Sequence, residues 1–214
     1  MIIEHSNIIS ELIPIILDKV KKQRLKIIEP TKKQRKDIIF YIYQFLKQYK
    51  RIVYGGMAQD ILLKRKSKNK MEVYGKYDAP DIEFYSPDPL VDMINLCDLL
   101  NNNNIPTEGS EAQHQNTYTI FCYYENICDI TFMPIEINNI LPYIELHEVR
   151  YIHPNFMYID ILRQLNDPII SYLQRLEKIT NRLNKISQYY PLNFKCIQYT
   201  KYNSLTKIQE NVIS

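Results

Sequence analysis

The stretch RIVYGG (residues 51–56) runs directly into MAQDILLKRK (residues 57–66), and APDIEFYSP follows at residues 79–87. The β-prone residues before the glycine pair predict a strand, and the apolar spacing after it predicts a helix. A glycine turn that opens a helix presents free N–H groups and a partial positive charge, which suit a triphosphate. The candidate phosphate-binding residues are therefore Gly55, Gly56 and Met57. A Gly-Gly pair between a strand and a helix is also common as a plain tight turn.

The second predicted strand has two carboxylates. Strand residues alternate between faces, so Asp81 and Glu83 project the same way, with Cα atoms about 6.5–7 Å apart, while Ile82 and Phe84 face the other side. Two such acids repel each other unless a cation lies between them, and oxygen ligands of this kind suit Mg²⁺. The alternative is an edge strand with a charged face in solvent.

A third acid, Asp129, is the one charge in the β-prone run ICDITFM (residues 127–133). Beside the first two acids it would complete a three-carboxylate cluster for two metal ions about 3.5–4 Å apart. A solvent-exposed strand face explains Asp129 equally well.

In this order, the glycine pair, Asp81-x-Glu83 and Asp129 resemble the nucleotidyltransferase superfamily of the DNA polymerase β type. The chain is most similar to one branch, the poly(A) polymerase catalytic subunits of large cytoplasmic DNA viruses. The resemblance covers most of residues 50–191. It rests on YGGMAQD (54–60), DIEFYSPDP (81–89), CDLL (97–100), AQHQNT (112–117), CDITFMP (128–134), YIHPNF (151–156) and YYP (189–191).

The resemblance implies an α+β fold, with a nucleotidyltransferase palm of mixed sheet backed by helices and flanked by N- and C-terminal helices. It implies template-independent addition of AMP from ATP to RNA 3′ ends by a two-metal mechanism. Asp81, Glu83 and Asp129 would be both catalytic residues and ligands of Mg²⁺, with Mn²⁺ as an alternative. The expected partners are ATP, an RNA 3′ end and a second protein subunit, and the expected location is cytoplasmic, in a viral factory or virion.

The resemblance also implies four candidates for contacts with RNA or phosphate. His114 stands alone before the third acid, and a lone histidine is more often a surface or structural residue. Three cations recur at helical spacing near the C-terminal end, where the alternative is a solvated helix face. They are Arg175, Lys178 and Arg182.

The sequence departs from the family pattern in two ways, and these departures leave alternative functions open. The interval between Gly56 and Asp81 is long, with SKNKMEVYGKY (residues 67–77) inserted, and such polymerases are considerably longer than 214 residues. We therefore expect a shortened form of the enzyme. A nucleotidyltransferase with a small-molecule or protein acceptor, or a non-catalytic module that binds RNA or a partner, remain alternatives.

Composition narrows the class of protein further. The net charge of +3 is too small to indicate a dedicated nucleic-acid-binding protein. The four cysteines form no C-x-x-C pair and no signal peptide opens the chain, so we expect reduced thiols in a cytosolic compartment. Cysteines and histidines do not cluster at zinc-ligand spacing, and no apolar run is long enough to span a membrane.

Hydrophobic periodicity predicts the other elements. We expect an amphipathic helix over 6–29 with a kink or break at Pro14, a helix from 31 to 50, and a polar loop over 67–80. A helix over 88–100 should cover the sheet with Val91, Ile94, Leu96, Cys97 and Leu100. Next come a hairpin turning at Glu125-Asn126, a strand over 149–152, and helices over 157–190. The expected domains are N-terminal helices packed on the palm (1–50), the palm (51–156), a C-terminal helical segment (157–192) and a tail (193–214).

Overall fold

The structure is a computed structural model that describes residues 2–113, 115–166 and 175–192, with side chains from residue 12 onward. Its helices are α1 (Ile2–Ile27), α2 (Lys32–Tyr49), α3 (Gly55–Ser67), α4 (Pro89–Asn102), α5 (Ile135–Asn138), α6 (Pro154–Asn166) and α8 (Leu176–Tyr189). Its strands are β1 (Ile52–Tyr54), β2 (Ile82–Ser86), β3 (Thr107–Glu111), β4 (Thr117–Cys122), β5 (Glu125–Phe132), β6 (Tyr143–Leu146) and β7 (Val149–Ile152).

The described strands form one seven-stranded mixed sheet in the order β3-β4-β5-β2-β1-β7-β6. The central strand β2 is antiparallel to β1 and parallel to β5, and β1 is parallel to β7. This mixed sheet confirms the predicted α+β class. The three stretches that suggested an active site therefore belong to the neighbouring strands β1, β2 and β5 at the middle of the sheet.

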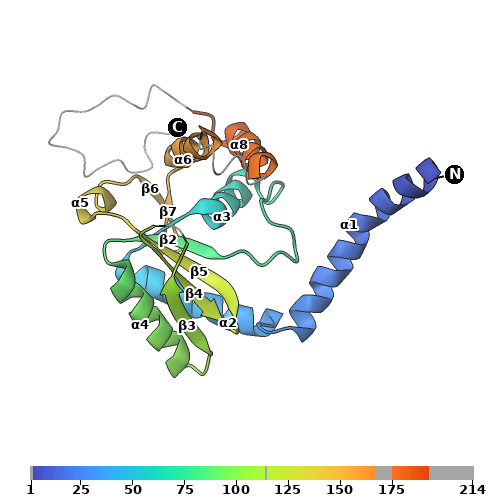
Figure 1. Cartoon of the computed structure of the whole chain (residues 1–214). Coiled ribbons are helices and arrows are strands. Elements are labelled where there is room, and N and C mark those ends of the chain that lie inside the picture. The colour runs from blue at the N-terminus through green and yellow to red at the C-terminus, as the bar shows by residue number, and fades with distance from the viewer. Residues whose placement is uncertain (1, 114, 167–174, 193–214) are drawn as a thin grey trace.

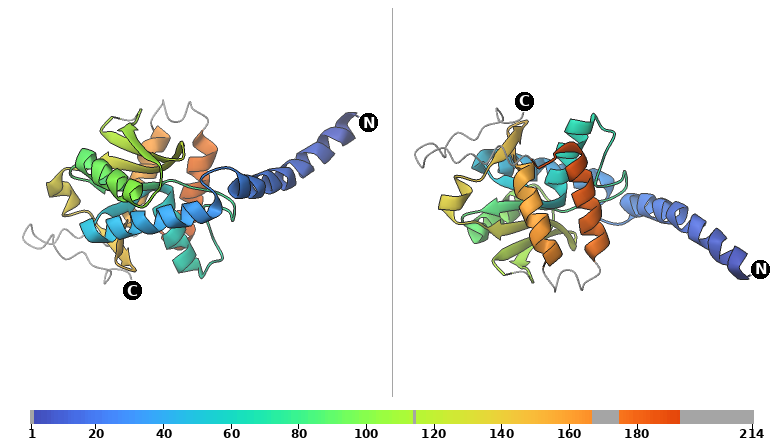
Figure 2. Two further views of the ribbon diagram at one scale, coloured as in Figure 1. Left: turned by 90° about the horizontal axis from the view of Figure 1, so that it is seen from below. Right: turned by 90° about the horizontal axis from the view of Figure 1, so that it is seen from above.

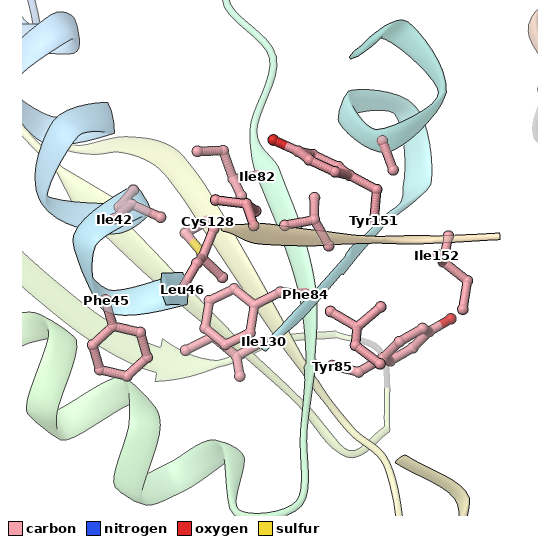
Figure 3. Close-up of a cluster of buried hydrophobic side chains, with 14 of the residues drawn as sticks. Ile42, Phe45, Leu46, Ile82, Phe84, Tyr85, Cys128, Ile130, Tyr151 and Ile152 are labelled. Atoms are coloured by element: carbon pink, nitrogen blue, oxygen red, sulfur yellow. The ribbon is translucent and has the colours of Figure 1, made fainter. Parts of the chain in front are cut away.

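Helices cover both faces of the sheet: α2 and α4 pack on one face, and α3, α6 and α8 lie on the other (Figures 1 and 2). Figure 3 shows the side chains of α2 against those of the sheet, including Ile42, Phe45 and Phe84. The rings of Phe45 and Phe84 are 6.1 Å apart. Since Phe84 points to the α2 side, its neighbour Glu83 points to the side of α3 and α8.

Local sequence signals explain where two of these helices start. Thr31 caps α2 in a capping box with Gln34, as each side chain bonds to the backbone N–H of the other residue. Asp88 caps α4 by accepting from the Val91 N–H, and Pro89 takes the first helical position. Helix α3 has no such side-chain cap at its N-terminus.

The prediction that both N-terminal helices pack on the palm is wrong for α1. This helix runs through Pro14 without a break and projects away from the sheet (Figure 1). Leu12 and Ile16 on its predicted apolar face are 45% and 55% exposed. The C-terminal part of α1 contacts the rest of the described chain through the ion pairs Lys21–Asp78 and Arg24–Glu125.

Three further expectations need correction. The hairpin of β4 and β5 turns at Tyr123-Tyr124, both at positive φ, two residues before the predicted turn. On α4, Val91 and Ile94 are about half exposed, so they do not cover the sheet. Strands β3 and β6 were not predicted. Strand β7 and the polar loop after α3 are confirmed.

The predicted domain boundaries stay a prediction, because the division of residues 51–156 from 157–192 is not tested by the fold. The predicted break near residue 167 and the tail from 193 lie outside the described residues. In the part of the chain that is described, no helix combines the length and apolar character needed to cross a membrane.

Candidate active site

Two predicted acids stand side by side at the centre of the sheet. In the parallel pair formed by β2 and β5, Glu83 is opposite Asp129. Asp81 precedes β2 by one residue, and by strand alternation it shares a side with Glu83. Ile82 and Phe84 are buried on the opposite side, as predicted. The tertiary structure thus brings together three acids that are up to 48 residues apart in sequence.

The glycine turn faces these acids. The Gly56 N–H donates to Glu83 Oε2 at 3.0 Å, so a carboxylate from β2 occupies the otherwise uncapped N-terminus of α3. Gly55 has φ +66°, and a Cβ there would lie 1.8 Å from Glu83 Oε2. Only glycine fits this approach of turn and acid. Met57, the third predicted residue of the turn, packs partly buried against the hydrophobic core.

The surroundings of Glu83 raise its pKa to about 7. Burial is the largest cause, followed by the charge of Asp81, and Asp129 adds to the effect. The Gly56 N–H and the Arg182 guanidinium act in the opposite direction. The acids therefore interact electrostatically, and a cation among them would relieve their repulsion.

Asp129 is held by its own strand neighbours. Thr119 Oγ1 donates to Asp129 Oδ1 at 2.7 Å, and Asn126 Nδ2 donates to the same oxygen at 3.3 Å. Within residues 2–113, 115–166 and 175–192, no three His, Cys, Asp or Glu side chains are placed so that they could hold a metal ion together. Three carboxylates at one end of two adjacent strands nevertheless provide the oxygen ligands that Mg²⁺ prefers. The residue types and strand register fit the metal, while Glu83 is turned toward the glycine turn.

Predicted cations of α8 face the same acids. A Cβ on Gly56 would lie 2.5 Å from Arg182 Nη2, which puts the guanidinium directly over the turn. Burial lowers the pKa of Lys178, as do the charges of Arg182 and Arg175, whereas Asp81 and Glu83 raise it. Arg175 is exposed at the start of α8. His114, the fourth candidate, lies outside the described residues.

Comparison with known proteins identifies the family of this chain. The family model for the poly(A) polymerase catalytic subunit matches residues 40–171, more than half of the chain. The chain belongs to the poly(A) polymerase catalytic subunit family. A protein of Acanthamoeba polyphaga mimivirus with that subunit name is 35% identical over 186 residues, which are 86% of this chain and 32% of the relative. One from African swine fever virus (strain Badajoz 1971 Vero-adapted) is 27% identical over 157 residues, 71% of this chain and 32% of the relative.

A solved structure shares the fold. The crystal structure of the Megavirus polyadenylate synthase matches with a TM-score of 0.82 at 34% identity, over 88% of this chain and 38% of that one. The predicted resemblance to viral poly(A) polymerases is thus confirmed. The chain spans about a third of the length of the curated relatives it matches.

Sequence reasoning missed two residues of this candidate site in the poly(A) polymerase family member. Tyr74 comes from the inserted loop, and its Oη accepts from Arg182 Nη2 at 2.9 Å. The buried Asp60 of α3 holds that loop by accepting from the backbone N–H groups of Val73 and Tyr74 at 2.7 and 3.2 Å. Asp60 could have been noticed, because it is an acid in the YGGMAQD motif within the first turns after the glycines. No sequence pattern marked Tyr74.

Proposed function

We propose that this domain transfers AMP from ATP to the 3′ end of an RNA without a template. The observation that supports it is the arrangement around Glu83: two acids on adjacent strands, a third two residues away, and the uncapped N-terminus of α3 facing them. Membership of the poly(A) polymerase catalytic subunit family supports the same reaction.

Asp81, Glu83 and Asp129 are the residues that would hold Mg²⁺, or Mn²⁺ in its place. When bound, such ions neutralise phosphate charge and lower the pKa of an attacking hydroxyl. The resemblance suggested two ions, and the three carboxylates are sufficient donors for that arrangement.

The chain's own residues then bind and orient the substrate. The Gly56 N–H is the group that would donate to a phosphate oxygen, so Glu83 must leave this amide when the nucleotide binds. Its departure frees the carboxylate for its metal-binding role. Arg182 lies over the turn and adds positive charge where the triphosphate would sit. Catalysis in this scheme depends on positioning and on neutralising charge, and no protein nucleophile is required.

Further contacts follow from the rest of the site. Arg175 and Lys178 would contact the RNA backbone or the triphosphate from α8, and we keep His114 as a candidate for the RNA end. A second protein subunit is a proposed partner, because the matching relatives are named as catalytic subunits. On the same viral relatives we propose a cytoplasmic site of action.

A primer-extension assay tests the proposal. An oligoadenylate primer is incubated with the protein, Mg²⁺ and each of the four NTPs in turn, alone and in the presence of candidate partner subunits. We expect extension with ATP, loss of extension in Asp81→Ala and Asp129→Ala, and retained ATP binding by Asp129→Ala in a calorimetric titration.

The matched control is Asp98→Ala, which removes an exposed acid of α4 on the other face of the sheet. It should extend the primer like the unchanged protein. Undiminished extension by Asp81→Ala would exclude the assignment. Binding of RNA without any binding of Mg-ATP would indicate a non-catalytic module instead.

A further inference from the structure

We infer that Tyr74 is a triphosphate-binding residue: its phenol oxygen fixes the Arg182 guanidinium over Gly56, while its phenol hydrogen donates to a phosphate oxygen. The inference rests on the proposed function, because it assumes that the turn at Gly56 binds phosphate. It gives the inserted loop a role in the site that the family resemblance does not supply.

The contacts at Gly56 point to this role. A Cβ at Gly56 would lie 2.0 Å from Tyr74 Oη and 2.5 Å from Arg182 Nη2, so both polar groups fill the space that a side chain would take. The Arg182 guanidinium also lies 5.8 Å from the centre of the Tyr74 ring. The Nε–H of Arg182 is buried and has no hydrogen-bond partner among the described residues. A buried, unpaired cationic donor beside a helix N-terminus calls for an anion.

The loop that carries Tyr74 is held in place on two sides. Asp60 accepts from the backbone N–H groups of Val73 and Tyr74 and also pairs with Lys64 at 2.8 Å. From α8, Lys185 Nζ donates to the Glu72 carbonyl at 2.8 Å. Tyr74 therefore has a defined position between α3 and α8 rather than that of an unanchored surface side chain.

The hydrogen-bond donors around Gly56 suit the phosphate groups of a nucleotide and not its nucleobase. Burial raises the pKa of Tyr74 to about 12, and Glu83, Asp81 and Asp60 contribute in the same direction while Arg182 opposes them. The phenol thus stays protonated at neutral pH. Its oxygen accepts from Arg182, which leaves the O–H to donate. The Gly56 N–H, the Arg182 N–H groups and the Tyr74 O–H are donors that phosphate oxygens accept, whichever base the nucleotide has.

Calorimetric titration of the full chain with ATP, inorganic tripolyphosphate and adenosine tests the inference. Tyr74→Phe keeps the ring and removes the hydroxyl. We expect it to weaken the binding of ATP and of tripolyphosphate by about tenfold, the usual effect of losing a hydrogen bond to a charged group. Binding of adenosine, which has no phosphate, should not change. Asp60→Asn should weaken tripolyphosphate binding in the same direction by loosening the loop.

Tyr77→Phe is the matched control, since it removes a hydroxyl from the same loop away from Gly56, and it should bind tripolyphosphate like the unchanged chain. If the unchanged chain binds tripolyphosphate and Tyr74→Phe binds it equally well, the inference is wrong while the proposed function stands. An equal loss of adenosine and tripolyphosphate binding would also overturn it, because that pattern indicates general damage. If the unchanged chain binds neither ATP nor tripolyphosphate, both proposals fail together.

Discussion

Glu83 is held between opposing neighbours. The Gly56 N–H and Arg182 favour its charged form, whereas burial, Asp81 and Asp129 favour the protonated form. The second set prevails, as the pKa is raised to about 7. The fold thus keeps a carboxylate at the centre of the sheet that is poorly matched to its present surroundings and well matched to a cation.

The first prediction concerns Gly55. Alanine at this position would have to adopt φ +66° and place its Cβ 1.8 Å from Glu83 Oε2. We expect Gly55→Ala to lower the free energy of unfolding by about 1–3 kcal/mol, measured by urea denaturation. Gly75→Ala is the control, because its Cβ would meet only Asp78 Oδ2 at an ordinary 3.5 Å. Equal stability of Gly55→Ala and the unchanged chain would show that the turn differs from the one described.

The second prediction concerns pH. Unfolded Glu83 loses its proton near its usual pKa of 4.5, whereas folded Glu83 keeps it until about pH 7. Between these values the folded state binds more protons, so the contribution of Glu83 to stability is lost as pH rises. Glu83→Gln should therefore show a weaker fall in the free energy of unfolding from pH 4.5 to 7 than the unchanged chain. Parallel stability curves for the two proteins would contradict the raised pKa.

At the scale of elements, burial follows the register of each helix against the sheet. On α4 the buried residues are Pro89, Asp92, Leu96 and Leu100, which recur every three or four residues. Asp92 is on this face because its carboxylate is paired with Arg51 at 2.6 Å. The sequence pattern suggested a stripe through Val91 and Ile94 because it weighed apolar residues only. A pattern based on apolar residues alone cannot predict that a charged residue such as Asp92 is buried with a partner.

The third prediction tests the corrected face of α4. Leu100 is fully buried, whereas Ile94 on the same helix is 48% exposed. Leu100→Ala should cost about 2–5 kcal/mol of unfolding free energy, since it leaves a cavity in the core. Ile94→Ala should cost less than about 1 kcal/mol. The midpoints of urea denaturation for the two variants measure the difference. Similar midpoints would show that Ile94 is buried against the sheet, as the sequence suggested.

At the scale of the whole molecule, the core and site gather around the sheet and α1 stands apart from them (Figure 1). The ion pairs Lys21–Asp78 and Arg24–Glu125 connect α1 to a loop and to a strand end, while Leu12, Ile16 and Val20 of this helix are about half exposed. Stability of the fold therefore depends on the sheet and on α2, α3, α4, α6 and α8.

The fourth prediction follows from linkage between ligand binding and folding. A ligand that binds only the folded state at 100 times its dissociation constant adds about 2.7 kcal/mol to the free energy of unfolding. We expect ATP with Mg²⁺ to raise the melting temperature, and EDTA to remove most of that increase, because the acids repel the triphosphate without a cation. In Asp81→Ala the difference between ATP with and without Mg²⁺ should shrink. An EDTA-insensitive increase would contradict a metal role for these acids.

The sequence by itself determined the α+β class, the family, the strand–glycine turn–helix unit and the alternation of β2. These features are local: glycines, caps and two-residue periodicity act within a few residues of chain. The exact turn of the β4–β5 hairpin and the whole β6–β7 hairpin were not readable from the sequence. Tyr123-Tyr124 and His147-Glu148 adopt positive φ there without the glycine or asparagine that usually marks it.

Only the tertiary structure decided which of these local features meet. The pairing of β2 with β5 places Asp129 opposite Glu83, and the packing of α8 over α3 brings Arg182 to Gly56 and Tyr74. Such contacts join residues dozens of positions apart, so their energy depends on the packing of whole elements and leaves no periodic signal in the chain. For the same reason the exposure of α1 could not be predicted from the sequence. Its amphipathic pattern indicates that an apolar surface would favourably cover one face, but not where in the molecule that surface lies.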